Sequence, residues 1–134
     1  MTTYEQLLAD CIRWAKEAGR IQLELFRSDR LDIEAKFNDS DVVTNADKAS
    51  EKAIISEIRR AYPEHSVLSE EAGCDKRMND WLWVIDPLDG TTNYSSGLPN
   101  FCVSIGVQHK GQTVVGVVYA PYLGEIFTAV RGKG

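Results

Sequence analysis

The hydrophobic positions in the first half of the chain recur with a helical period. One apolar stripe at three- and four-residue steps consists of Leu7, Cys11, Trp14, Ala18, Ile21 and Leu25. Thr2 and Glu5 fit a capping box in front of this stripe, which predicts an amphipathic helix over residues ~3–27. A second stripe follows Thr44 and consists of Ala46, Ala49, Ala53, Ile54, Ile58 and Ala61. It ends at Tyr62-Pro63, where a second helix is expected to stop.

The hydrophobic period changes from residue 66 onward to one that is typical of strands. Short apolar runs bounded by turn or acidic residues lie at 66–69, 81–85, 101–108, 113–119 and 125–130. The last three runs are rich in β-branched residues and follow one another closely, which predicts an antiparallel meander. We therefore predict the α+β class, with two N-terminal helices packed on a mainly antiparallel sheet in one domain over residues 1–134.

The composition argues against several classes of protein. The 134 residues carry 20 acidic and 15 basic side chains, a net charge of −5, without a basic block that could grip a nucleic-acid backbone. No apolar run approaches the roughly 18 residues that a bilayer span needs, and no basic leader precedes the first helix. The three cysteines match neither a zinc ribbon nor a CxxC pair. We expect a cytoplasmic protein with reduced thiols that binds neither nucleic acid nor a membrane.

The densest chemical information lies in the segment Asp86-Pro-Leu-Asp-Gly-Thr-Thr-Asn93, at the end of a buried run. Asp86 and Asp89 are delivered there with a proline-stiffened turn between them. Gly90 permits a close backbone approach, and Thr91 can open a helix whose first amides face outward. Carboxylates bind Mg²⁺ and free amides bind phosphate, so the segment favours metal-dependent phosphate chemistry. A turn that only caps a helix would use the same residue types.

Two other acidic positions belong to the same hypothesis. Glu70 follows a strand-like run, so it converges with Asp86 if the two strands are neighbours. Clustered carboxylates repel one another unless a cation neutralises them, and we assign Glu70 to this site and Glu71 to the solvated surface. Asp47 lies in the first turn of the second predicted helix, which Thr44 can cap. The helix dipole alone would also explain an acid at that position.

The three motifs, in this order and spacing, resemble the inositol monophosphatase family. The resemblance rests on Val43-Thr-Asn-Ala-Asp47, Glu70-Glu71 and residues 86–93, and it extends to residues 101–106, 116–119 and 131–134. It implies that the chain is the N-terminal, metal- and phosphate-binding half of a layered αβαβα phosphatase, with the C-terminal domain absent. The implied reaction is Mg²⁺-dependent hydrolysis of a small phosphate monoester, above all inositol monophosphate, by metal-activated water.

The resemblance also implies roles for individual residues. The implied metal ligands are Glu70, Asp86, the backbone carbonyl of Leu88, and Asp89, which reaches a second ion. The implied phosphate-binding residues are Leu88, Asp89, Gly90 and Thr91, of which Gly90 and Thr91 contribute main-chain amides. The implied catalytic residues are Glu70, Asp47 and Thr91, and the Asp47 carboxylate and Thr91 hydroxyl orient and deprotonate water. Lys36 matches a region that closes over the site in relatives.

Other interpretations stay open at the level of the sequence. The substrate could instead be a nucleotide 3′-phosphate, fructose bisphosphate or histidinol phosphate. A truncated, non-catalytic domain could bind metal or a protein partner through an uncovered sheet edge. Relatives are commonly dimers, which makes a homodimer one expected assembly. His65 and His109 have no metal-ligand spacing and are both expected at the surface.

Overall fold

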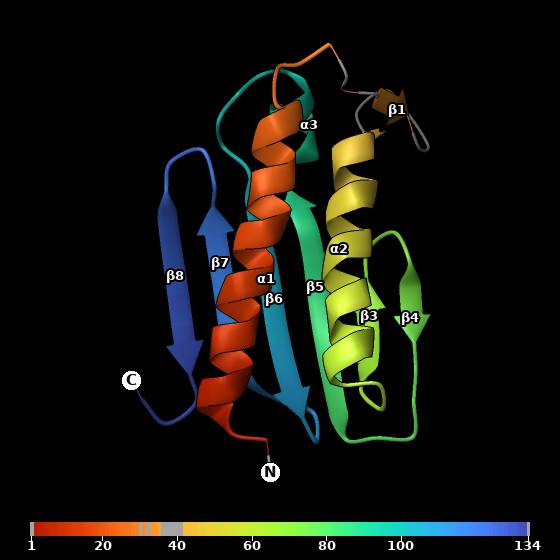
Figure 1. Ribbon diagram of the computed structural model, residues 1–134, viewed down its shortest axis with the longest axis vertical. Coiled ribbons are helices and arrows are strands. Elements are labelled where there is room, and N and C mark those ends of the chain that lie inside the picture. The colour runs from red at the N-terminus through yellow and green to blue at the C-terminus, as the bar shows by residue number, and fades with distance from the viewer. Residues whose placement is uncertain (1, 30, 32, 36–41, 134) are drawn as a thin grey trace.

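Two helices cover one face of a six-stranded sheet (Figure 1). The computed structural model describes residues 2–29, 31, 33–35 and 42–133. The helical layer consists of α1 (Tyr4–Leu25) and α2 (Asn45–Ala61). The strand order is β4-β3-β5-β6-β7-β8, in which β3 and β5 are parallel and the other neighbours are antiparallel. The predicted α+β class, with helices on a mainly antiparallel sheet, is confirmed.

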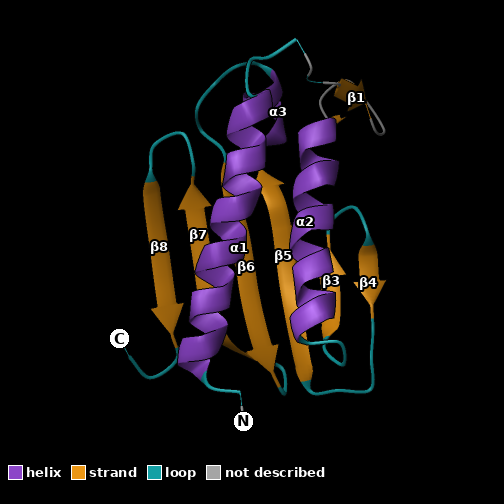
Figure 2. Ribbon diagram, in the orientation of Figure 1, coloured by secondary structure: helices purple, strands orange, loops and turns teal. Residues whose placement is uncertain are grey.

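The remaining elements complete this arrangement (Figure 2). The strands of the large sheet are β3 (Ser66–Ser69), β4 (Gly73–Asp75), β5 (Trp81–Asp89), β6 (Cys102–His109), β7 (Gln112–Ala120) and β8 (Glu125–Val130). A separate antiparallel pair precedes α2 and consists of β1 (Ile33–Ala35) and β2 (Val42–Thr44). A short helix, α3 (Thr91–Ser95), follows β5 directly. Because β5 carries the predicted site motif into α3, this junction is the part of the fold that bears on function.

The helix caps show how local signals set the ends of α1 and α2. In α2 the predicted cap is confirmed, since Asp47 N donates to Thr44 Oγ1 and Thr44 N donates to Asp47 Oδ1 at 2.7 Å. In α1 the predicted register is wrong by one residue. Thr3 is the N-cap, and its reciprocal partner is Gln6. Two successive threonines offer both registers, and a glutamine completes a capping box as well as a glutamate does.

The main core lies between the two helices and the sheet. On β6, Val103, Ile105 and Val107 point into this core, while the intervening Ser104 and Gly106 lie on the opposite face. The buried side chains that surround them include Leu7, Trp14, Ile54, Ile58, Val67, Trp83, Ile85, Val115 and Val117. Burying each such side chain contributes about 1.5–3 kcal/mol. Across the described part of the chain, no helix is both long enough and apolar enough to pass through a bilayer.

A smaller core lies under the junction of β5 and α3. Its buried members are Ala46, Leu88, Tyr94 and Phe101, and Phe26 packs against them. The Phe26 ring lies 5.3 Å from that of Tyr94 and 5.0 Å from that of Phe101. This cluster ties α1, α2 and α3 to the end of β5, so the backbone around the predicted site rests on packed side chains.

His65 is buried, which corrects the prediction that both histidines lie at the surface. Only 7% of the residue is exposed, and its Nδ1 accepts the indole proton of Trp83 at 2.9 Å. Its ring stacks between Tyr62 and Trp81, at centroid distances of 4.8 and 5.5 Å. Trp81 stacks in turn on His109 at 4.0 Å. These partners come from three separate segments, so no local pattern around His65 signals its burial.

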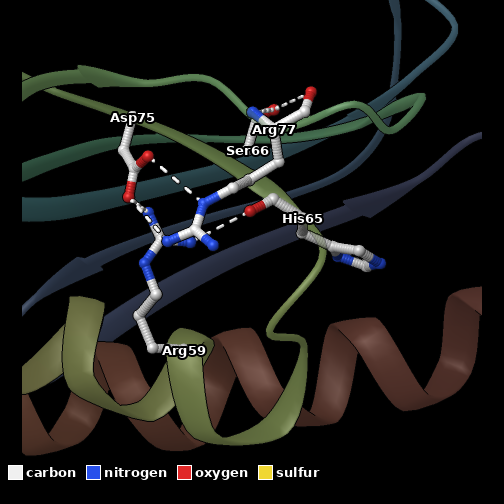
Figure 3. Close-up of polar contacts among 5 residues, drawn as sticks. All are labelled: Arg59, His65, Ser66, Asp75 and Arg77. Carbon is white, nitrogen blue, oxygen red and sulfur yellow. Dashed lines mark hydrogen bonds and ion pairs between the residues drawn. The ribbon is translucent and has the colours of Figure 1, made fainter.

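A polar cluster holds the backbone beside His65 (Figure 3). Arg59 of α2 donates to the His65 carbonyl at 3.0 Å and also pairs with the carboxylate of Asp75 in β4. Arg77 pairs with the same carboxylate, and its backbone N–H donates to Ser66 Oγ at 2.7 Å. The cluster therefore joins the end of α2 to the β3–β4 edge of the sheet.

We expect wild-type protein to lose stability relative to His65→Gln as the pH falls from about 7.5 to about 5.5. Burial lowers the pKa of His65, Glu64 opposes this shift and His109 adds to it. In the unfolded chain the pKa is about 6.5, so below that pH the unfolded state binds more protons and the native state is penalised. A glutamine can still accept the Trp83 proton but does not titrate.

Urea unfolding at both pH values measures this difference. The carboxylates at the other end of β5 titrate in both proteins, so the comparison isolates His65. His109→Gln serves as the matched control: it removes only the smallest of the three causes that act on the pKa of His65, so most of the wild-type pH dependence should remain. The prediction would be contradicted if the difference in the free energy of unfolding between wild type and His65→Gln were the same at both pH values.

Candidate functional site

The parallel pairing of β3 and β5 brings the predicted carboxylates to one edge of the sheet. Ser69 at the end of β3 pairs with Ile85 in β5, so Glu70 and Asp86 follow at neighbouring positions. The Glu70 carboxylate is close enough to Asp86 for its charge to raise the pKa of that residue. The structure thus places these two residues together, as the strand-neighbour hypothesis requires.

The segment between Asp86 and Asp89 is a bulge in β5, which corrects the predicted turn. Asp86 pairs with Ser104 and Asp89 pairs with Cys102, and the register shifts between these two pairs. Pro87 has no backbone N–H to give to the ladder, and proline inside a sheet is accommodated at such irregular positions. Pairing with β6 therefore continues past the proline and keeps both carboxylates on one strand.

A cavity of about 290 Å³ collects most of the predicted site residues. Its lining consists of Glu70, Asp86, Leu88, Asp89, Gly90, Thr91, Thr92 and Asn93. All four residues that the family resemblance implies as metal ligands are in this lining, and so is the whole implied phosphate-binding segment. Asp47 is absent from the lining and reaches it through Thr91. Lys36 lies outside the described residues.

The electrostatics of the cavity favour a cation. Burial, followed by the charges of Glu70 and Asp89, raises the pKa of Asp86 to about 7. Asp86 Oδ1 is buried and has no hydrogen-bond partner among the described residues. Within those residues no group of three or more His, Cys, Asp or Glu side chains is already gathered as a metal cluster. The partnerless oxygen and the crowded carboxylates nevertheless fit a hard divalent ion, which takes oxygen ligands.

Asp47 connects the start of α2 to the start of α3. The residue is 4% exposed, and its Oδ1 accepts from Thr44 N and from Thr44 Oγ1, the latter at 2.6 Å. The Thr91 hydroxyl lies 2.8 Å from Asp47 Oδ2 and 3.0 Å from the Leu88 carbonyl oxygen, so its one proton can go to either acceptor. Capping therefore explains only one of the two oxygens of Asp47. The other oxygen faces a residue of the cavity.

Gly90 allows the backbone to enter α3 at close quarters. Its φ is +90°, and a Cβ at this position would lie 2.7 Å from the backbone oxygen of Asn100. The Asn93 side chain donates to the same oxygen at 3.0 Å. The predicted close approach at Gly90 is therefore confirmed, and the structure identifies the Asn100 segment as the neighbour.

One residue in contact with the site carries no motif signal. Gln22 of α1 is fully buried and donates to the carbonyl of Pro87, inside the bulge, at 2.6 Å. The available sequence signal is a polar residue on an apolar helix face, four positions after Ala18. Such a residue indicates a buried hydrogen bond without naming its partner.

This arrangement of helices, sheet and carboxylate-bearing bulge is a phosphatase-type fold of the α+β class. The chain belongs to the inositol monophosphatase family, whose family model matches residues 3–134. It is 51% identical over 130 residues to the protein named Nus factor SuhB of Pasteurella multocida, in an alignment that covers 96% of this chain and 48% of that protein. The chain therefore spans about half the length of the curated relatives it matches.

Solved structures agree with the family assignment. The extragenic suppressor protein suhB from Bartonella henselae superposes with a TM-score of 0.91 at 35% identity, over 96% of this chain and 50% of that one. A structure described as IMPase/NADP phosphatase complexed with Mg²⁺ and phosphate superposes with a TM-score of 0.85 at 26% identity, over 99% and 51% of the two chains. That relative is therefore described with a divalent cation and phosphate as its ligands.

Proposed function

We propose that residues 1–134 form a metal- and phosphate-binding domain that hydrolyses a small phosphate monoester, with inositol monophosphate as the first candidate substrate. The observation that carries this proposal is the cavity in which Glu70, Asp86 and Asp89 meet the backbone of Gly90 and Thr91. Family membership and the relative complexed with Mg²⁺ and phosphate support the same chemistry. The substrate itself is inferred from the family.

Four cavity residues are proposed to hold Mg²⁺: Glu70, Asp86, the carbonyl of Leu88, and Asp89. A bound Mg²⁺ supplies Lewis-acid chemistry, in that it lowers the pKa of water and stabilises negative charge on oxygen. The protein contributes a pair of neighbouring carboxylates, the exposed Glu70 and the half-buried Asp86, whose mutual repulsion a cation relieves. Metal binding should therefore be coupled to the stability of this end of the sheet.

The remaining cavity groups are proposed to handle the phosphate and the water. The amides of Gly90 and Thr91 lie at the start of α3, where N–H groups have no partner within the helix, and they would donate to phosphate oxygens. In the arrangement proposed here the Thr91 proton lies toward Asp47 Oδ2, one of its two acceptors, which leaves the lone pairs of the hydroxyl to accept from a water molecule. Thr91 would then take a proton from the water and pass its own hydroxyl proton to Asp47, while Glu70 supplies a second carboxylate in the cavity lining.

We expect the purified chain to release phosphate from inositol 1-phosphate in about millimolar Mg²⁺, and Glu70→Gln to lower the rate by about 100-fold or more. Glu70 lines the cavity beside Asp86 and raises the pKa of that residue, so its charge is part of the proposed metal site. Glu71→Gln is the matched control, because Glu71 is exposed and outside the cavity lining. Its rate should stay within about two-fold of the wild type.

Three outcomes of this assay are informative. Equal losses in the two variants would contradict the assignment of Glu70 over Glu71. A wild-type chain that binds Mg²⁺ yet releases no phosphate would contradict catalysis and favour a non-catalytic metal-binding domain. Faster release from a nucleotide 3′-phosphate, fructose bisphosphate or histidinol phosphate would replace inositol monophosphate as the substrate.

A further inference from the structure

We propose that Gln22 is a positioning residue, which fixes the β5 bulge so that Asp86 and the Leu88 carbonyl face the cavity. This inference rests on the proposed function, since it concerns the same metal-binding residues. Gln22 lies in α1, on the far side of the bulge from solvent, and is not itself part of the cavity lining.

The contacts of Gln22 join four elements at one buried point. Its Nε2 donates to the Pro87 carbonyl in β5 at 2.6 Å and to Ser50 Oγ in α2 at 3.1 Å. Its backbone carbonyl accepts the hydroxyl proton of Tyr94 in α3 at 2.7 Å. Both side-chain partners are distant in the sequence, and Gln22 and Ser50 are each 0% exposed. One amide group therefore sets the distance between α1, α2 and the bulge.

The bond to Pro87 acts at the centre of the proposed ligand set. Asp86 and Leu88 flank this residue, and the ladder between β5 and β6 is interrupted between Asp86 and Asp89. Without a ladder partner, the orientation of the Pro87 peptide depends on other hydrogen bonds. The Gln22 amide supplies one of them. Leaving the buried Pro87 carbonyl without this bond would lower the free energy of unfolding by about 1–3 kcal/mol. Holding this peptide also fixes the directions of the Asp86 side chain and the Leu88 carbonyl beside it.

The same amide connects the bulge to the proposed water-orienting pair. Ser50 lies three residues after Asp47 in α2, and Asp47 holds Thr91 across the cavity wall. Thr91 Oγ1 is in turn 3.0 Å from the Leu88 carbonyl oxygen. Gln22 thus contacts α2 close to the water-orienting Asp47, and it contacts β5 between the proposed metal ligands Asp86 and Leu88.

Burying the Gln22 amide carries a free-energy cost, which indicates that the side chain does more than fill space in the core. Gln22 Oε1 is buried and has no hydrogen-bond partner among the residues that the structure describes. An apolar side chain of similar length would avoid this unpaired oxygen, which is unfavourable by about 1–3 kcal/mol. Gln22→Met should therefore keep most of the stability of the fold while it releases the Pro87 carbonyl. Loss of site geometry without loss of folding distinguishes positioning from a structural role.

Calorimetric titration of Mn²⁺ or Mg²⁺ into the 134-residue chain tests this inference. We expect Gln22→Met to raise the metal Kd by about 10-fold, in the range found for groups that orient metal ligands, with an unfolding midpoint close to that of the wild type. Ser50→Ala is the matched control, because it removes the second partner of Gln22 and leaves the Pro87 bond intact. Its Kd should stay within about two-fold of the wild type. Gln22→Asn, one methylene too short to reach Pro87, replaces the methionine variant if that variant does not fold.

Amide hydrogen exchange on the metal-free proteins gives a second readout. The amides from Leu88 to Thr92 should exchange about 10-fold faster in Gln22→Met than in the wild type, because the bulge is less restrained. Unchanged exchange together with an unchanged Kd would overturn the inference. A wild-type chain that binds neither ion would overturn the proposed function instead, and the exchange comparison would still decide whether Gln22 restrains the bulge.

Discussion

Asp86→Asn should make the metal-free protein more stable and, at the same time, remove its response to Mg²⁺. The Asp86 carboxylate is half-buried, is repelled by the charges of Glu70 and Asp89, and has a buried oxygen without a partner in the described structure. At about pH 8 its charge is therefore unfavourable in the absence of a cation. Replacing the carboxylate with an amide removes the repulsion, which we expect to raise the free energy of unfolding by about 1–3 kcal/mol.

Thermal unfolding with and without Mg²⁺ measures both parts of this prediction. At a Mg²⁺ concentration ten times its Kd, binding to the native state stabilises the wild type by about 1.4 kcal/mol, and Asp86→Asn should show almost none of this gain. Asp75→Asn is the matched control in the same sheet. Its carboxylate is exposed and paired with Arg59 and Arg77, so this variant should be less stable than the wild type and still respond to Mg²⁺. An Asp86→Asn protein that is destabilised and still responds would contradict the proposed metal site.

The parts of the fold that could be predicted are those whose causes are local. The cap formed by Thr44 and Asp47 needs only four consecutive residues, and the alternation along β6 needs only one exposed and one buried face. The turn at Lys110-Gly111 is equally local, since left-handed φ values of 53° and 81° suit a two-residue hairpin. In contrast, β4 consists of three exposed residues without an apolar pattern, and only its pairing with β3 makes it a strand.

The same distinction between local causes and distant partners applies to the candidate site. The sequence motifs place Glu70 and Asp86 at the ends of apolar runs, and parallel pairing then brings the two together. Whether Pro87 makes a turn or a bulge depends on the partner strand β6, which no residue of the motif reveals. The roles of Gln22 and His65 depend on partners 65 and 18 positions away along the chain. Buried polar residues of this kind are visible in the sequence only as exceptions to an apolar pattern.

Gly90→Ala is expected to destabilise the protein by about 2–4 kcal/mol, from backbone strain and a steric clash together. The φ of +90° is unfavourable for any residue with a Cβ. The added Cβ would also meet the Asn100 carbonyl at 2.7 Å and the Phe101 Cα at 3.3 Å. Both neighbours are backbone atoms, and Phe101 is anchored in the smaller core. The clash therefore has to be relieved by moving the β5–α3 junction.

Gly111→Ala separates the two contributions to this effect. Its φ of +81° imposes a similar strain, but no atom lies within 4 Å of the added Cβ. Urea unfolding of this variant should show a loss of only about 1 kcal/mol. Because both variants share the backbone strain, the difference between their free energies of unfolding measures the clash at the β5–α3 junction. Movement of this junction should also weaken Mg²⁺ binding, and only in Gly90→Ala. Equal destabilisation of both variants, with Mg²⁺ binding intact, would show that the junction yields without cost and that Gly90 does not set the edge of the cavity.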